Sequence, residues 1–139
     1  FLRSNEVWNN TRIIIVSDHG RNLEQFKHMI LTNGVDIQSF NALLMVKDFN
    51  SNDAVYTDNS FMTTGDVLSF AVKDLFNTPK NPYTGNLVKE PGMISSAIIT
   101  TSVNESLSKN HGNVLASSDG KWYEVKDNIF DEKNWTELQ

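Results

Sequence analysis

The stretch Ile13-Ile14-Ile15-Val16-Ser17-Asp18-His19-Gly20 decides the fold that this sequence predicts. Its four consecutive β-branched residues form a short apolar run, which is typical of a strand buried on both faces. In open α/β sheets, ligands bind beyond the carboxyl ends of the strands, and this strand ends at Asp18 and His19. Both side chains can turn onto one ion once the chain leaves the strand, and Gly20 permits the sharp bend. Asp18 and His19 are therefore candidate metal ligands.

The residue types at this strand end also favour certain metals over others. An anionic oxygen beside a neutral imidazole suits Zn²⁺, Mn²⁺ or Fe better than Ca²⁺, which prefers a shell of oxygen atoms. A plainer interpretation is that Asp18 caps the following helix and His19 is solvated, because such a short motif often occurs by chance. The other two histidines, His28 and His111, are predicted to lie at the surface, outside any metal site.

Composition and charge limit the classes of partner. A chain of 139 residues is long enough for one domain with a hydrophobic core, and 39% of its residues are apolar. The net charge is −5 and there is no basic stripe, which argues against nucleic acid and anionic membrane surfaces as partners. The longest apolar run, Ala42 to Val46, is far too short to span a bilayer. No cysteine is present, which excludes disulfides and thiolate chemistry. The chain opens with Phe1, without a methionine, which we interpret as the start of a piece of a longer protein.

The first half of the sequence has the pattern of a strand, a helix and a second strand. Apolar residues recur at helical spacing over residues 23–31, and Asn33-Gly34 is predicted to end that helix in a left-handed conformation. Ala42 to Val46 is predicted to be the second buried strand. The three elements span about 35 residues, which is the length of a right-handed βαβ unit. Lys47 follows the second strand and either reaches an anionic substrate or is solvated at the strand terminus.

The second half predicts one helix followed by antiparallel strands. Thr63 stands three residues before Asp66, which is typical of a helix cap and makes Thr63 and Thr64 poor candidates for a nucleophile. An apolar face then runs from Val67 to Phe76, and a turn is expected at 81–85. Further strands are predicted at 97–101 and in a hairpin whose arms, 114–116 and 122–125, flank an Asp-Gly tip.

Several of these segments resemble a known protein family. They are the stretch from Ile14 to Gly20, Asn41 to Phe49, Phe61-Met62-Thr63 with Asp66-Val67, Asn81 to Gly85, and Trp122-Tyr123, Asp127 to Phe130 and Trp135 near the end. Together they resemble the C-terminal part of the sulfatase-like branch of the alkaline phosphatase superfamily. The closing segments are similar to bacterial, membrane-anchored phosphoglycerol transferases and lipoteichoic acid synthases. The resemblance extends from about Thr11 to Trp135.

The resemblance implies a metal site and a chemistry. In that family the aspartate and histidine of this motif bind a catalytic metal, so the role passes by position to Asp18 and His19. Family sulfatases that use Ca²⁺ usually carry asparagine where this chain has His19, so the histidine points toward phospho-ester chemistry with Mn²⁺ or Zn²⁺. Ala42 and Leu68 stand where relatives commonly have proline. The family's nucleophile and other acidic metal ligands come from N-terminal segments that these 139 residues do not contain.

The resemblance also implies the architecture and the setting. We expect residues 1–139 to be the C-terminal portion of an α/β sandwich like that of alkaline phosphatase, with the βαβ unit followed by a helix and a small antiparallel sheet. Its partners would be the N-terminal remainder of the same protein and an anionic ester substrate, at the extracytoplasmic face of a bacterial membrane. The parent would transfer or hydrolyse phosphate or sulfate esters of cell-envelope glycans or lipid head groups, whereas the fragment alone, lacking the nucleophile, would be inactive. The alternative is a catalytically inactive binding or structural module.

Overall fold

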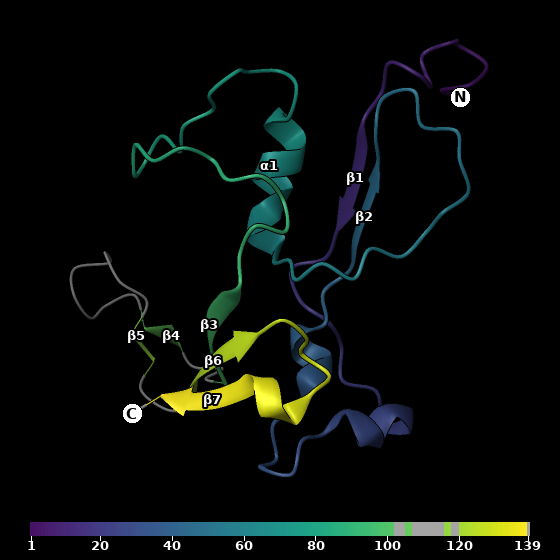
Figure 1. Ribbon diagram of the computed structural model, residues 1–139. Coiled ribbons are helices and arrows are strands. Elements are labelled where there is room, and N and C mark those ends of the chain that lie inside the picture. Colours follow the sequence, from purple (N-terminus) through teal and green to yellow (C-terminus); the bar gives the residue numbers. More distant parts are fainter. Residues whose placement is uncertain (102–104, 107–115, 118–119, 139) are drawn as a thin grey trace.

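A computed structural model of the chain describes residues 1–101, 105–106, 116–117 and 120–138, with residues 105–106 and 116–117 described by their backbone pairing. The described part has mixed α and β structure, with few helices and small antiparallel sheets (Figure 1). The strands are β1 (Ile13–Val16), β2 (Leu44–Lys47), β3 (Ser96–Thr100), β4 (Glu105–Ser106), β5 (Ala116–Ser117), β6 (Trp122–Lys126) and β7 (Trp135–Leu138). The helical segments are the α-helix α1 (Val67–Val72) and the 3₁₀ segments η1 (Glu24–Met29), η2 (Ile37–Phe40), η3 (Thr64–Asp66) and η5 (Glu132–Asn134).

Strands β1 and β2 form at the two predicted apolar runs, but they are antiparallel, and the predicted burial is wrong because neither strand contains a buried residue. Ile13 pairs with Lys47 and Val16 with Leu44, and the Ser17 N–H extends the ladder by donating to the Leu43 carbonyl at 3.0 Å. The predicted βαβ unit is therefore wrong. A parallel pair needs a crossover, usually an α-helix, whereas the chain between these strands forms only two short 3₁₀ segments and then turns back.

The predicted helix over residues 23–31 is only a broken 3₁₀ segment. Phe26 has non-helical backbone angles of φ −108° and ψ 34°, and η1 contains no buried residue. Of the apolar side chains at helical spacing, Met29 packs against the hydrophobic core, whereas Leu23 and Phe26 are 38% and 39% exposed. The end of the segment follows the prediction, because Gly34 has a positive φ of 87° and its N–H donates to the Leu31 carbonyl.

Helix α1 begins as predicted and ends early. Thr63 forms a capping box with Asp66, in which each side chain accepts a hydrogen bond from the backbone near the other. The helix ends at Val72, because Lys73 leaves the helical region with ψ 134°. The continuation of the apolar face to Phe76 is therefore wrong, and that side chain is 64% exposed. The turn at 81–85 forms, with the Gly85 N–H donating to the Asn81 carbonyl.

The three-stranded sheet β3–β6–β7 forms the main core of the described residues. Alternation along the central strand β6 buries Tyr123 and Val125, each about 1% exposed. They pack with Trp135 of β7 and with Val35 and Ile37 from the region of η2. The core thus joins the last two strands to a segment in the first third of the sequence, and Figure 1 shows η2 beside β6 and β7.

The predicted strand at 97–101 corresponds to β3, and the predicted strand at 122–125 corresponds to β6. The predicted hairpin is wrong in its pairing within the described residues: β6 pairs with β3 and β7, and β5 pairs with β4. Residues 114–115 and 118–119 of that hairpin, and His111, lie outside the described residues. The local sequence predicts that a strand and a turn form. Which strand pairs with it depends on packing of the apolar faces, which the local sequence does not contain.

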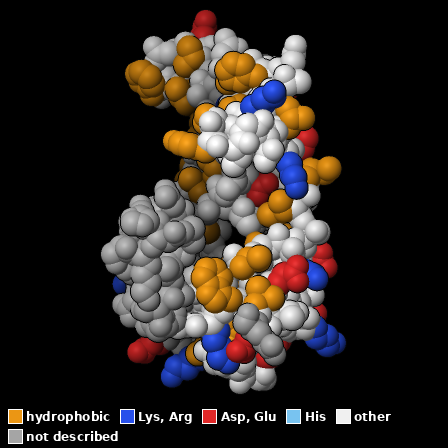
Figure 2. All heavy atoms as spheres, turned by 90° about the vertical axis from the view of Figure 1, so that its left-hand side faces the viewer, with side chains coloured by type: hydrophobic (Ala, Val, Ile, Leu, Met, Phe, Trp, Pro, Cys, Tyr) orange, Lys and Arg blue, Asp and Glu red, His pale blue; other side chains and the backbone are white. Residues whose placement is uncertain are grey.

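Much apolar surface stays uncovered. Only five hydrophobic residues of the described part are buried, and 21 large ones are exposed. Figure 2 shows hydrophobic side chains over one face, several of them gathered at its upper end. No helix in the described ranges combines the length and apolar character that crossing a membrane requires.

Candidate metal centre

The segment that follows β1 is held at both of its ends. At Ser17, the backbone N–H donates to the Leu43 carbonyl and the hydroxyl accepts from the Leu43 N–H at 2.8 Å. At Gly20, the N–H donates to the Ser39 carbonyl at 2.9 Å. Asp18 and His19 lie between these two anchors, so their backbone is held at the strand end.

Gly20 is required for a reason that differs from the predicted one. It is absent from the glycines with positive φ, so the bend does not depend on a left-handed conformation. A Cβ atom at this position would instead lie 1.9 Å from the Gln38 carbonyl oxygen and 2.8 Å from that of Asn41. The absence of a side chain therefore lets the strand end pass directly over the backbone of η2.

Asp18 and His19 lie next to each other and face solvent. Their side chains are 87% and 71% exposed, and the Asp18 Oδ2 and His19 Nε2 atoms are 3.7 Å apart. The Asp18 Oδ1 atom accepts a hydrogen bond from the His19 backbone N–H at 2.9 Å. The plainer interpretation is therefore wrong about Asp18, which caps no helix because η1 follows Leu23 without a side-chain cap, and right about His19, which is exposed.

The contact of the imidazole with the backbone shows which ring nitrogen is engaged. His19 Nδ1 lies 2.6 Å from the Gly20 carbonyl oxygen. A carbonyl oxygen only accepts, so Nδ1 is the donor in this contact, and in the neutral ring Nε2 then carries the lone pair. Metal-binding histidines usually donate the N–H of their other ring nitrogen to such an acceptor. This hydrogen bond fixes the orientation of the ring and raises the basicity of the nitrogen that binds the metal.

The distance between the free atoms suits a common ion. Two ligand atoms at about 2.1 Å from a tetrahedral Zn²⁺ are about 3.4 Å apart, close to the observed 3.7 Å. Asp18 and His19 can therefore share one ion with little movement. A complete site needs more, because the described residues contain no cluster of three or more His, Cys, Asp or Glu side chains.

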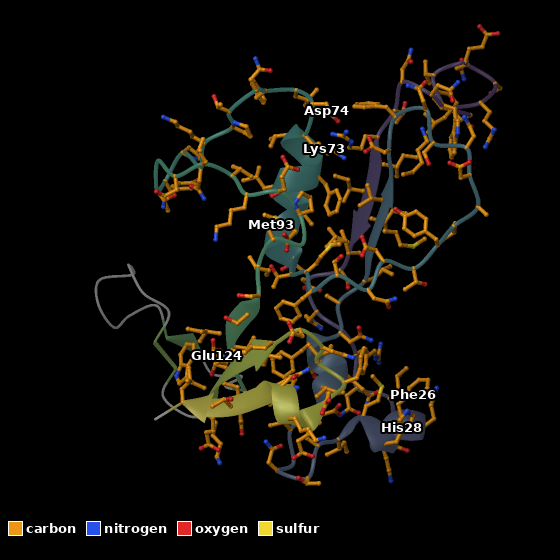
Figure 3. The ribbon with its side chains drawn as sticks, in the orientation of Figure 1. Phe26, His28, Lys73, Asp74, Met93 and Glu124 are labelled. Carbon is orange, nitrogen blue, oxygen red and sulfur yellow. The ribbon has the colours of Figure 1, made fainter. Side chains whose placement is uncertain are left out.

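The remaining candidates are engaged elsewhere. His28 is exposed and packs edge-on against the Phe26 ring at 5.9 Å, as Figure 3 shows, so it keeps its predicted surface role. Lys47 donates to the backbone carbonyls of Trp8 and Thr11, so it is neither a solvated side chain nor aimed at a ligand. Thr63 serves the capping box, in agreement with its prediction.

A charged cluster at the other end of the β1–β2 pair was missed by the sequence analysis. The Arg12 side chain, 6% exposed, donates through Nε and Nη2 to Asp48 Oδ1 at 2.9 and 2.7 Å. It also donates to Asp74 and to the Phe70 and Lys73 carbonyls at the end of α1. Lys73 and Asp74 lie together in Figure 3. Arg12 therefore ties the sheet to the helix.

The cluster changes the pKa of its central carboxyl. Burial alone would raise the pKa of Asp48, but the hydrogen bonds from Arg12 and the Phe49 N–H, together with the charges of Arg12 and Lys73, outweigh it and lower the pKa. The cluster follows from the register of the two strands, because Ile13 opposite Lys47 places Arg12 opposite Asp48. That register can be read only once the strands are known to be antiparallel.

One pocket lies apart from the motif. It measures about 340 Å³, runs along α1 and is lined by Thr63, Asp66, Ser69 and Lys89 among others, but by neither Asp18 nor His19. Two of its polar side chains have partners, since Asp66 serves the cap and the Ser69 hydroxyl donates to the Lys89 carbonyl.

Comparisons with family models, with curated proteins and with solved structures find no match for this chain.

Proposed function

We propose that this chain supplies half of the metal site of a metal-dependent phospho-ester or sulfate-ester transferase or hydrolase. Asp18 and His19 are the metal ligands, and the remaining ligands and the nucleophile come from outside these 139 residues. The chain is then the C-terminal portion of a sulfatase-like catalytic domain that acts on cell-envelope glycans or lipid head groups at the extracytoplasmic face of a bacterial membrane. This setting rests on the sequence resemblance.

The observation that supports the proposal best is the hydrogen bond from His19 Nδ1 to the Gly20 carbonyl at 2.6 Å. In the neutral ring this leaves the Nε2 lone pair 3.7 Å from Asp18 Oδ2, and both side chains are exposed to solvent. A helix cap does not account for Asp18, because η1 has no side-chain cap. A pair of metal ligands accounts for the orientation of the imidazole toward Asp18.

The donor set suggests the metal. One carboxylate oxygen and one imidazole nitrogen suit Mn²⁺ or Zn²⁺ better than Ca²⁺ or Mg²⁺. Such an ion would stabilise a hydroxyl nucleophile and the charge on the transferred group. The residues of this chain hold the ion and orient the imidazole, and Ser17 and Gly20 keep the pair in place at the strand end.

A catalytically inactive relative is the second candidate. It is favoured by one observation, namely that only two metal-binding side chains meet at the motif and no third joins them within the described residues. A protein of this kind would bind anionic glycans or lipid head groups without turnover, or would serve as a structural module.

Metal binding by the 139-residue chain tests the proposal. Isothermal titration with Mn²⁺, Zn²⁺ and Ca²⁺ should show weak binding of the first two and weaker binding of Ca²⁺, because two ligands are fewer than the three or four of a complete site. His19→Asn and Asp18→Asn should abolish the binding. His28→Asn is the matched control, since this exposed histidine lies outside the motif, and it should leave binding unchanged.

The outcomes separate the candidates. Equal binding by wild type and His19→Asn would remove His19 from the metal site and overturn the proposal. Binding should also weaken at acid pH, because the ligands must be deprotonated. The 139-residue chain should not hydrolyse an aryl phosphate at a measurable rate. Metal-dependent turnover that Asp18→Asn abolishes would show that the chain holds a complete site.

A further inference from the structure

The chain is poorly covered for its mass. Its accessible surface is 10586 Å². A compact monomer of 15.7 kDa is expected to expose about 7,300 Å². The observed total includes the residues outside the described ranges. An interface of standard size takes about 800 Å² from each partner, so about a quarter of the excess of about 3,300 Å² would supply one side of it.

Part of this uncovered surface lies on one face of the β1–β2 pair. Ile15 and Met45 stand directly opposite each other, so they project from the same face, and Leu43 lies two residues from Met45 on that face. These side chains are 51%, 45% and 50% exposed. An apolar cross-strand pair with an apolar neighbour is typical of a sheet face that packs against protein.

The edges of the same pair are also uncovered. The Ser17–Leu43 bond fixes the pattern of the ladder, so Ile15 and Met45 form a hydrogen-bonded pair, while Ile14 and Val46 direct their N–H and C=O groups outward. Within the described residues, these outward groups make no hydrogen bond and no third strand joins the pair. The four residues of β1 include no charge and no proline to protect its edge.

A sheet of two strands is marginal by itself. We propose that a β-strand of another polypeptide segment completes it, pairing with a free edge of β1 or β2, and that this segment covers Ile15, Leu43 and Met45. A polypeptide fits this surface because it supplies both backbone groups in register for the edge and apolar side chains for the face. A second copy of this chain fits less well, because each copy carries a net charge of −5.

The position of the surface gives the added strand a role in the site. β1 leads into Asp18 and His19, and Figure 1 shows β2 lying beside β1 and running in the opposite direction. If the function proposed above holds, on which this step rests, the docked segment also carries the missing metal ligands. Docking and completion of the site are then one event.

Cysteine labelling tests the docking surface without reference to activity. The chain has no cysteine, so Met45→Cys introduces a single thiol on the apolar face. Tyr83→Cys is the control, because Tyr83 is 95% exposed in a turn away from the β1–β2 pair. Both variants are labelled with a maleimide in the native protein from its own cells and in the isolated 139-residue chain, and the modified peptides are quantified by mass spectrometry.

We expect the thiol of the Met45→Cys variant to react about tenfold more slowly than that of Tyr83→Cys in the native protein. In the isolated chain, which should sediment as a monomer, the two thiols should react at similar rates. Equal rates in the native protein would overturn the docking surface. An isolated chain that sediments as a dimer, with the thiol of Met45→Cys protected, would also overturn it, in favour of a second copy.

Amide hydrogen exchange of the wild type provides a measurement that no substitution can disturb. In the native protein, the amides of the edge that receives the strand should be protected, namely those of Ile14 and Val16 on β1 or those of Leu44 and Val46 on β2. All four should exchange rapidly in the isolated chain. Rapid exchange of all four in the native protein as well would contradict the added strand.

The same measurement separates the docking from the proposed function. A native protein that protects one of these edges but shows no metal-dependent activity would contradict the proposed function alone. An active protein in which both edges exchange rapidly would contradict the docking alone.

Discussion

Arg12 and Asp48 lie opposite each other at the end of the β1–β2 pair. The Arg12 Nε and Nη2 atoms donate to the same carboxylate oxygen of Asp48, at 2.9 and 2.7 Å. The Arg12 side chain is 6% exposed, whereas that of Asp48 is 38% exposed. The arginine also stacks over the Phe49 ring, with 4.5 Å between its Cζ and the ring centroid. This pair is the electrostatic link between the β1–β2 sheet and α1.

Acid should weaken this link. The pKa of Asp48 is lowered in the folded chain, so its stabilising effect is complete above the ordinary carboxyl pKa of about 4 and is lost as the pH falls through the lower, folded value. Denaturant midpoints measured from pH 7 downward should therefore fall more steeply below about pH 4 for wild type than for Asp48→Asn. Asp53→Asn, in an exposed loop, is the control and should follow wild type. Parallel curves for wild type and Asp48→Asn would contradict the prediction.

Gly20→Ala should be strongly destabilising. The new methyl group would overlap the Gln38 carbonyl oxygen, which belongs to the backbone and cannot rotate away. We expect a loss of about 3 kcal/mol in the free energy of unfolding, measured by urea denaturation. Gly34→Ala is the comparison: its methyl group meets no atom within 4 Å, but its φ of 87° is strained for alanine, so it should lose about 1 kcal/mol. The reverse order would mean that η2 does not lie against Gly20.

Thr63→Ala should destabilise the start of α1 by about 1 kcal/mol, because the Gly65 N–H then loses the hydroxyl acceptor that lies 3.2 Å away. Thr63→Ser and Thr63→Asp should be nearly neutral, since both keep a capping oxygen. Thr64→Ala is the matched control, one residue further along and exposed. Equal denaturation midpoints for Thr63→Ala and wild type would show that the Thr63 hydroxyl does not stabilise the start of α1.

Tyr123→Phe should leave the chain as stable or make it more stable. The Tyr123 hydroxyl is buried in the apolar core, and no hydrogen-bond partner for it exists in the described part of the chain. Removing an unpaired buried hydroxyl should raise the free energy of unfolding by up to about 1 kcal/mol. Tyr56→Phe, at an 83% exposed site, is the control and should be neutral. A clear loss of stability in Tyr123→Phe would reveal a partner for the hydroxyl.

Features with a local cause could be predicted from the sequence. The strand at Ile13–Val16 follows from its β-branched run, and the start of α1 follows from Thr63 and Asp66. The contact between Asp18 and His19 is local as well, since the two residues are neighbours in the chain. The hydrogen bond from His19 to the Gly20 carbonyl is equally local, but the sequence does not say which rotamer the ring adopts.

Features that depend on pairing could not be predicted in this way. An apolar run such as that of β2 fits a parallel and an antiparallel neighbour equally well, so the predicted direction of β2 was wrong. The Arg12–Asp48 pair depends on that direction and could not be predicted either. The 23–31 helix was wrong for a related reason. Helical spacing stabilises a helix only when a surface receives its whole apolar face, and Leu23, Phe26 and Ile30 of this face stay exposed.

The composition of the main core sets an order of events during synthesis. Its two halves are Val35 with Ile37 and, much later, Tyr123, Val125 and Trp135. A hydrogen bond between the Thr32 N–H and Glu132 Oε2, at 3.3 Å, closes a loop across a hundred positions. Closing such a loop costs conformational entropy before the contacts between its two ends stabilise the chain, which slows folding. Val35 and Ile37 therefore emerge from the ribosome without their partners, and the core can close only after Trp135 has been added.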